Sequence, residues 1–193
     1  MSRKVKGSLF VDYVRMIRAS KHLEWSAHLT PGDLNLLAER IVPYAWYPME
    51  AFERFGNAIL RELVGGDLSL VSLWGRLSVD ELAAQYDGLL VPGDPRESMM
   101  RFQVLRGSFF NFPAVEISML IDHKAHVAIN YEMGEIAEEA ASLQTQGFFE
   151  RMLEASGAQE VRATFLSRRW SGDPGTVLQL TWLTAGSSQR RPE

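Results

Sequence analysis

The chain has 193 residues, of which 46% are hydrophobic and 23% are charged, a composition typical of a globular domain with its own core. It contains no cysteine, which excludes disulfides, thiolate metal sites and cysteine nucleophiles. A formal net charge of −4 gives no general attraction to nucleic acid or to anionic membranes. The most apolar run is too short to span a bilayer, so we expect a cytoplasmic protein.

The N-terminal half has the pattern of a helical region. Apolar residues recur at helical spacing from Leu9 to Ile17. Thr30 and Pro31 form a start signal for a helix that ends near Ile41, because Thr30 can cap the helix and Pro31 suits its first position. Another helix is expected from about residue 48 to the glycine pair at 65–66.

The same signals continue up to residue 105. They predict two short helices at 68–74 and 78–86, the second of which begins at a capping box formed by Ser78 and Glu81. A further helix is expected at 95–105, directly after Asp94. The region before the first predicted strand therefore consists of helices alone.

From about residue 116 the hydrophobic period changes to alternation, which predicts β-strands. A short loop at 123–125 is expected to join two antiparallel strands. In that register Ile121 lies opposite Val127, and the apolar residues of both strands share one face.

A long helix is expected at about 135–156, with Ile136 and Phe148 among its inward side chains. Gly147 inside it either permits close helix packing or is a tolerated kink. A second hairpin follows, with its turn at 171–175. The predicted fold class is α+β, with a helical N-terminal part followed by an antiparallel sheet built from hairpin–helix–hairpin. We expect one domain over residues 1–185 and a disordered tail at 186–193.

Aromatic and apolar residues suggest a ligand site. The segment around residues 44–55 is rich in aromatic side chains, which either fill the core or line an apolar pocket between helices and sheet. The pocket hypothesis names six lining residues: Trp46, Tyr47, Phe52, Met99, Phe102 and Phe148.

Catalytic and metal-binding patterns are weak. Asp122, His123 and His126 lie close together in sequence, but two or three ligands at a hairpin tip make a poor preformed metal site. Phosphate-binding, nucleophile-elbow and zinc-protease signatures are absent from the sequence. We therefore expect no metal, no cofactor and no catalytic residue, and a protein that is not an enzyme.

Three stretches carry a resemblance to a known family: Lys6 to Phe10, Tyr47 to Phe52, and Gly147 to Ala158 followed by Leu180-Thr181-Trp182. In these stretches the chain resembles a paralogous domain family of unknown function that is expanded in myxobacteria. That family looks related to the haem nitric-oxide-binding domains, the vinyl-reductase-type ligand-binding domains and the TRAPP trafficking subunits. The resemblance implies a TRAPP-like fold and a binding role.

The chain departs from the haem-binding members of this group. They carry a Tyr-x-Ser-x-Arg signature, which none of the tyrosines here begins, and no proximal histidine can be assigned. We therefore expect a protein–protein interaction or assembly and regulatory module, which binds a protein partner or itself, with a sensor for an apolar small molecule as the alternative. An unrecognised enzyme is a third hypothesis, and it requires acidic or histidine side chains that converge in a cleft.

Overall fold

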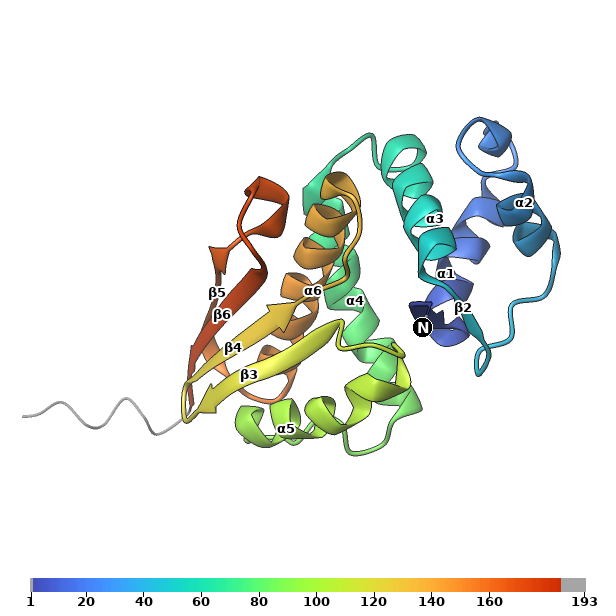
Figure 1. Ribbon diagram of the computed structural model, residues 1–193. Helices are drawn as coiled ribbons and strands as arrows, with labels where there is room; N and C mark the ends of the chain where they lie inside the picture. The colour runs from blue at the N-terminus through green and yellow to red at the C-terminus, as the bar shows by residue number, and fades with distance from the viewer. Residues whose placement is uncertain (1, 185–193) are drawn as a thin grey trace, which may run out of the picture. The chain divides into compact units, whose positions relative to one another are not determined.

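The computed structural model describes residues 2–184 (Figure 1). Within them the contacts define two compact units, the first formed by residues 2–68 and 107–113 and the second by residues 69–106 and 114–184. The single domain expected over residues 1–185 stays a prediction, and the expected tail at 186–193 lies outside the described residues. None of the described helices is both long enough and apolar enough to cross a membrane.

The first unit combines helices with two very short strands. In chain order its elements are β1 (Lys4–Lys6), α1 (Gly7–Ala19), the 3-10 turn η1 (Trp25–Ala27), α2 (Pro31–Ala38), β2 (Trp46–Pro48) and α3 (Met49–Glu62). The helix expected from Leu9 onward, the one after Thr30 and the one after Pro48 are all present, although α2 ends at Ala38 and not near Ile41.

The strands β1 and β2 were not predicted, because three residues are too few to show alternation. They pair antiparallel, with Lys6 opposite Trp46. The other edge of β1 binds a segment about a hundred residues further along the chain, where the Lys6 N–H donates to the Phe109 carbonyl at 2.8 Å and the Asn111 N–H donates to the Lys4 carbonyl at 3.2 Å. These long-range bonds stabilise strands that could not persist alone.

The second unit contains the larger sheet. Its elements are α4 (Leu68–Gln85), α5 (Pro95–Leu105), η2 (Arg106–Ser108, shared with the first unit), β3 (Val115–Ile121), β4 (Lys124–Ile129), α6 (Glu135–Ala155), β5 (Gln159–Ser167), η3 (Arg169–Ser171) and β6 (Thr176–Leu183). All four strands are antiparallel, in the order β3-β4-β6-β5. The predicted α+β fold, with its hairpin–helix–hairpin sheet, is confirmed.

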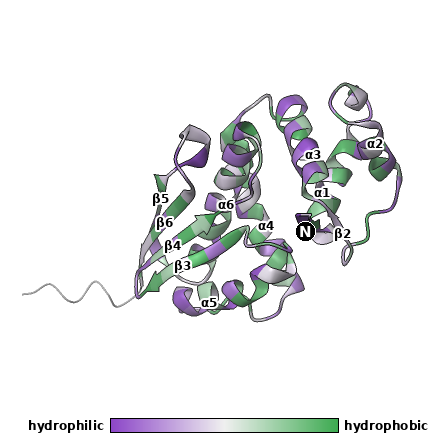
Figure 2. Cartoon of the chain, viewed as in Figure 1, coloured by the Kyte–Doolittle hydropathy of each residue, from purple (hydrophilic) through white to green (hydrophobic). Residues whose placement is uncertain are grey.

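One face of this sheet is covered by α6, and α4 packs against α6, while α5 contacts both α6 and β3 (Figure 1). Hydrophobic and hydrophilic residues alternate along the strands (Figure 2). The side chains that face α6 are almost fully buried, and they are Ala125, Val127, Ile129, Leu178, Leu180 and Trp182. Burial of this apolar surface is the main stabilising contribution to the unit.

Three predictions for this unit were wrong. Residues 68–85 form one continuous helix and not two, and the Ser78 hydroxyl donates to the carbonyl of Gly75 at 2.7 Å and caps nothing. The first hairpin turns at residues 122–123, so Ile121 lies opposite Lys124, and with a further shift at a bulge after Ile117 it is Ile117 that lies opposite Val127. Ile136 is 67% exposed, because it lies on the side of α6 away from the sheet.

Candidate functional site

The six residues of the predicted pocket fall into two groups, three in each unit. In the first unit Trp46 and Tyr47 belong to β2 and Phe52 belongs to α3. In the second unit Met99 and Phe102 belong to α5 and Phe148 belongs to α6. All but Trp46 belong to a cluster of neighbouring apolar side chains within their unit, whereas a single pocket lined by all six stays a prediction.

The cluster in the first unit surrounds the fully buried Phe10. Its ring centroid lies 5.3 Å from that of Tyr47 and 6.0 Å from that of Phe52, and Phe52 stacks on Tyr13 with their ring centroids 4.4 Å apart. Tyr47 is also fixed at its hydroxyl, which accepts a hydrogen bond from the Val42 N–H at 2.8 Å. This arrangement joins α1, β2 and α3 through aromatic contacts.

Trp46 differs from the other five residues. It lies on the outer face of β2 and is 38% exposed, and the Lys6 ammonium lies 4.0 Å from the centre of its ring. This is a cation–π contact at the surface. Trp46 is therefore outside the aromatic cluster around Phe10.

The cluster in the second unit lies where α5 contacts α6. The rings of Phe102, Phe148 and Phe149 are mutual neighbours, with centroid separations of 5.2, 5.1 and 5.5 Å. Met99 lies one turn before Phe102 on α5 and is fully buried. Phe148 is half-buried, so one ring of this triad remains in contact with solvent. The three rings and the thioether of Met99 form an apolar cluster in which Phe102, Phe149 and Met99 are buried.

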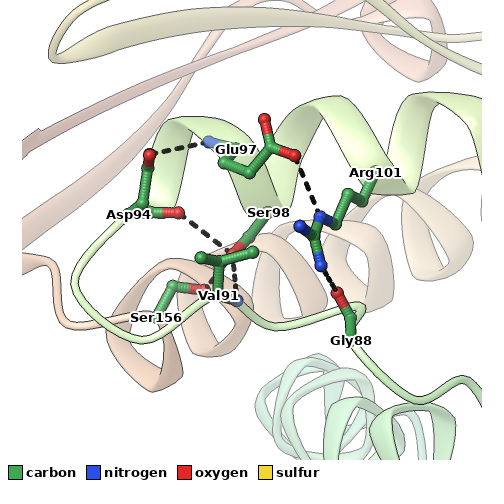
Figure 3. Close-up of polar contacts among 7 residues, drawn as sticks. All are labelled: Gly88, Val91, Asp94, Glu97, Ser98, Arg101 and Ser156. Atoms are coloured by element: carbon green, nitrogen blue, oxygen red, sulfur yellow. Dashed lines mark hydrogen bonds and ion pairs between the residues drawn. The ribbon is translucent and has the colours of Figure 1, made fainter.

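A polar network fixes α5 next to this cluster (Figure 3). The Asp94 side chain caps α5 by accepting from the Glu97 N–H at 2.8 Å. The buried Ser98 hydroxyl accepts from the Val91 N–H at 2.8 Å and lies 2.8 Å from the hydroxyl of Ser156, at the end of α6. Because Ser98 precedes Met99, the network sets how α5 meets α6.

The start of α6 carries a second set of buried polar groups. The carboxylate of Glu138 accepts from the backbone N–H groups of Tyr131 and Met133, at 3.3 and 2.9 Å. The Tyr131 hydroxyl lies 2.7 Å from that of Thr145, and burial raises the pKa of Tyr131 to about 12. Ser142, between Glu138 and Thr145 on the helix, has a buried hydroxyl with no hydrogen-bond partner among the described residues. These groups anchor the β4–α6 connection.

The first unit has a buried carboxylate held by an arginine. Arg54 on α3 donates to both carboxylate oxygens of Asp33, at 2.7 and 2.8 Å, and Thr30 completes a capping box with the same carboxylate. Burial alone raises the pKa of Asp33, but the hydrogen bonds from Arg54 and Thr30 outweigh it, so this pKa lies below its ordinary value. The pair connects α2 to α3, and its charges are already matched, so it has the character of a structural contact.

Solved structures of H-NOX proteins share this fold. An H-NOX protein from S. oneidensis in its Fe(II)NO ligation state matches with a TM-score of 0.61 at 12% identity, over 92% of this chain and 99% of that chain. A point mutant of the K. algicida H-NOX protein, in its unliganded Fe(II) form, matches with a TM-score of 0.62 at 11% identity, over 96% and 100%. A point mutant of the T. tengcongensis H-NOX protein gives 0.59 at 8% identity, over 92% and 97%.

At identities this low, the likeness shows a shared fold and does not show a shared function. The resemblance to haem nitric-oxide-binding domains that the sequence suggested is confirmed at that level. The likeness to the myxobacterial family and to TRAPP subunits stays a prediction. No model of a protein family matches the sequence, and no curated protein matches it.

The histidines of this chain do not fit a haem. Haem iron in proteins is held mostly by histidine, or by cysteine, methionine or tyrosine. His22 and His123 are exposed, His28 contacts the Glu62 carboxylate at 2.7 Å, and His126 contacts the Gln179 amide at 3.2 Å on the outer sheet face. Tyr131, the buried phenol near α6, already bonds to Thr145.

The structure separates the three residues that lie close together in sequence at 122–126. Asp122 and His123 form the turn itself, whereas His126 lies within β4 beside Gln179. Throughout residues 2–184 no group of three His, Cys, Asp or Glu side chains is placed to hold a metal ion.

Proposed function

We propose that the protein is a non-enzymatic sensor domain that binds an apolar small molecule without haem. The observation that carries this proposal is the ring triad of Phe102, Phe148 and Phe149 beside Met99, fixed by a buried polar network in an H-NOX-like fold. An apolar ligand gains contact area with such rings, and few polar groups are needed to orient it.

The placement of the histidines supports a ligand other than haem. None of the four lies in the interior of its unit, so a haem iron would lack its usual axial ligand. In this proposal the aromatic side chains contact the ligand directly. Phe148 is the entry point, because it is the least buried member of the triad.

The first test is native mass spectrometry of the purified chain, compared with the denatured chain. A mass increment that survives natively and disappears on denaturation supports a bound small molecule. The sample is then titrated with 8-anilinonaphthalene-1-sulfonate, an apolar fluorescent probe. We expect Phe148→Ala to weaken probe binding, because it removes one ring of the triad.

The matched control is Val104→Ala on α5, since Val104 is 86% exposed and is outside the triad. Binding by the control should equal that of the unmodified chain. If Phe148→Ala and Val104→Ala bind the probe equally well, the triad is not the ligand site.

A protein-interaction module is the second candidate function. The observation that favours it is a row of exposed leucines on α4, at positions 70, 73 and 77. The two functions are compatible, because a sensor needs a surface through which a partner detects its state.

A further inference from the structure

Ser142 on α6 differs from the buried hydroxyls that follow it along the helix. It is fully buried, yet its hydroxyl has no hydrogen-bond partner among the described residues. Thr145 and Ser156, by contrast, each donate to the carbonyl four residues earlier, at 2.8 and 2.7 Å. That bond is the ordinary one for a hydroxyl on a helix, and Ser142 does not make it.

A buried hydroxyl without a partner is costly. On folding it loses its hydrogen bonds to solvent, and no bond to the protein compensates for that loss. Buried polar side chains are therefore nearly always bonded, to protein or to an internal water molecule. The surroundings of Ser142 indicate which of these partners it has.

Three other polar side chains lie close to Ser142 in the interior. Glu138 precedes it by four residues and Thr145 follows it by three, so all three side chains share one side of α6. Both neighbours are buried, and the Tyr131 hydroxyl lies 2.7 Å from that of Thr145. All four residues belong to the second unit.

The directions of the hydrogen bonds leave acceptors within this group. The Thr145 hydroxyl donates to the Ala141 carbonyl, so it accepts from Tyr131, whose oxygen can accept a bond in turn. The Glu138 carboxylate accepts from two loop N–H groups, and a carboxylate can accept about four bonds in all. The cluster thus combines a donor at Ser142 with acceptors at Glu138 and Tyr131.

A water molecule matches this set of groups. We propose that Ser142 donates to an internal water molecule, which in turn donates to the Glu138 carboxylate and to the Tyr131 phenol oxygen. Internal waters in proteins occupy enclosed sites of this kind and make about three hydrogen bonds there. An apolar ligand would leave the Ser142 hydroxyl unbonded.

The bound water gives the polar cluster a structural role. Glu138 holds the loop at 131–133 through the backbone N–H groups of Tyr131 and Met133. The water joins that carboxylate to Ser142, one turn further along α6. It therefore adds a connection between the end of β4 and α6. This inference does not depend on the ligand of the ring triad.

The test counts long-lived internal waters in the full chain by oxygen-17 magnetic relaxation dispersion. Ser142→Ala should lower that number by about one, because the water loses its donor. In urea denaturation the same variant should raise the equilibrium constant for unfolding by about two- to tenfold. A high-resolution crystal structure of the unmodified chain should place a water oxygen about 2.7–3.0 Å from Ser142 Oγ.

Ser156→Ala is the matched control, since it removes a buried hydroxyl whose bonds are to Ser98 and to the Met152 carbonyl. It should leave the number of internal waters unchanged.

An equal number of internal waters in Ser142→Ala and the unmodified chain would overturn the proposal. So would a Ser142→Ala variant that is more stable than the unmodified chain, because removal of a hydroxyl without any partner should stabilise the fold. A crystal structure in which Ser142 donates to the Glu138 carbonyl, as Thr145 does to Ala141, would also contradict it.

Discussion

Gly75 on α4 and Gly147 on α6 mark the place where the two helices come closest. A Cβ atom on Gly75 would overlap the backbone carbonyl of Gln144, and one on Gly147 would overlap the backbone carbonyl of Ser72. Each glycine thus faces the main chain of the other helix. Glycine inside a helix lowers its stability relative to alanine. The close contact between α4 and α6 must therefore stabilise the fold by more than this loss.

The first prediction concerns these glycines. Gly75→Ala and Gly147→Ala should each lower the free energy of unfolding by about 1–3 kcal/mol, because the added methyl group meets backbone and cannot be relieved by a rotamer change. Urea denaturation followed by circular dichroism measures the effect.

Gly32→Ala on α2 is the matched control. A Cβ at Gly32 meets only the Thr30 hydroxyl, at 3.8 Å, so alanine should be neutral or stabilise by up to about 1 kcal/mol. If all three variants behave alike, helix propensity and not close packing governs these positions.

Gly75 also shows why part of the fold could be read from the sequence and part could not. Helix starts at Thr30-Pro31 and Asp94-Pro95 were predicted correctly, because a cap acts within three or four residues. The continuity of α4 through Gly75 was missed, since a glycine followed by a capping box is typical of a helix boundary. What keeps the helix intact is its contact with α6, about seventy residues away.

The predicted register of β3 and β4 was wrong for a similar reason. The alternation of β4 was correct, and Ala125, Val127 and Ile129 are buried as a set. Its pairing with β3 depends on a bulge after Ile117 and a two-residue turn, neither of which alternation can detect. Which side chains of a strand are buried can be read from local alternation, whereas which residues of the next strand they pair with cannot.

The candidate site could also be predicted only in part from the sequence. Sequence reasoning selected Phe102 and Phe148, which are in contact, but omitted Phe149, the ring that joins both. Its position four residues after Thr145 and three before Met152, on the buried side of α6, was the available signal. Ser98 and Ser156 gave no signal, because their partnership spans 58 residues.

The second prediction tests that serine pair. Ser98→Ala should lower the free energy of unfolding by about 1–3 kcal/mol, because the part-buried Val91 N–H loses its acceptor. Ser156→Ala should cost less, since its hydroxyl acts as a donor, to Ser98 and to the Met152 carbonyl. Thermal and urea denaturation of both single variants and the double variant give the coupling energy.

A coupling energy near zero would show that the two hydroxyls act independently, contrary to their separation of 2.8 Å. Ser171→Ala, at an exposed position of η3, is the control, and it should change stability by less than about 0.5 kcal/mol.

The third prediction is a pH dependence due to Tyr131. Burial raises its pKa to about 12 in the folded chain, against about 10 when unfolded. Its contribution to stability is therefore fully present below about pH 10 and is lost as the pH rises toward 12. Across that range the unmodified chain should lose on the order of 2–3 kcal/mol more than Tyr131→Phe.

The comparison with Tyr131→Phe removes the effect of other groups that titrate above pH 10. Tyr44→Phe is the matched control, because Tyr44 is 80% exposed and its replacement should leave the pH profile unchanged. Parallel profiles for Tyr131→Phe and the unmodified chain would contradict the buried, neutral phenol.

The fourth prediction concerns Arg54 and Asp33. Arg54→Met should destabilise the chain at about pH 7, by about 1–2 kcal/mol, because it leaves a buried carboxylate without its two strongest donors. The expected loss is modest because the Arg54 side chain is 40% exposed to screening solvent. Urea denaturation of both proteins from about pH 7 to about pH 2 measures the difference.

The sign of the pH dependence follows from the lowered pKa of Asp33. Its stabilising contribution is present above the ordinary pKa of aspartate, about 3.9, and is lost as the pH falls through the lower folded value. The destabilisation by Arg54→Met should therefore shrink toward pH 2. Arg15→Met removes a surface pair with Asp12 whose arginine is 71% exposed, and it should have little effect at any pH. An Arg54→Met penalty that stays constant down to pH 2 would mean that Arg54 acts through packing and not through the charge of Asp33.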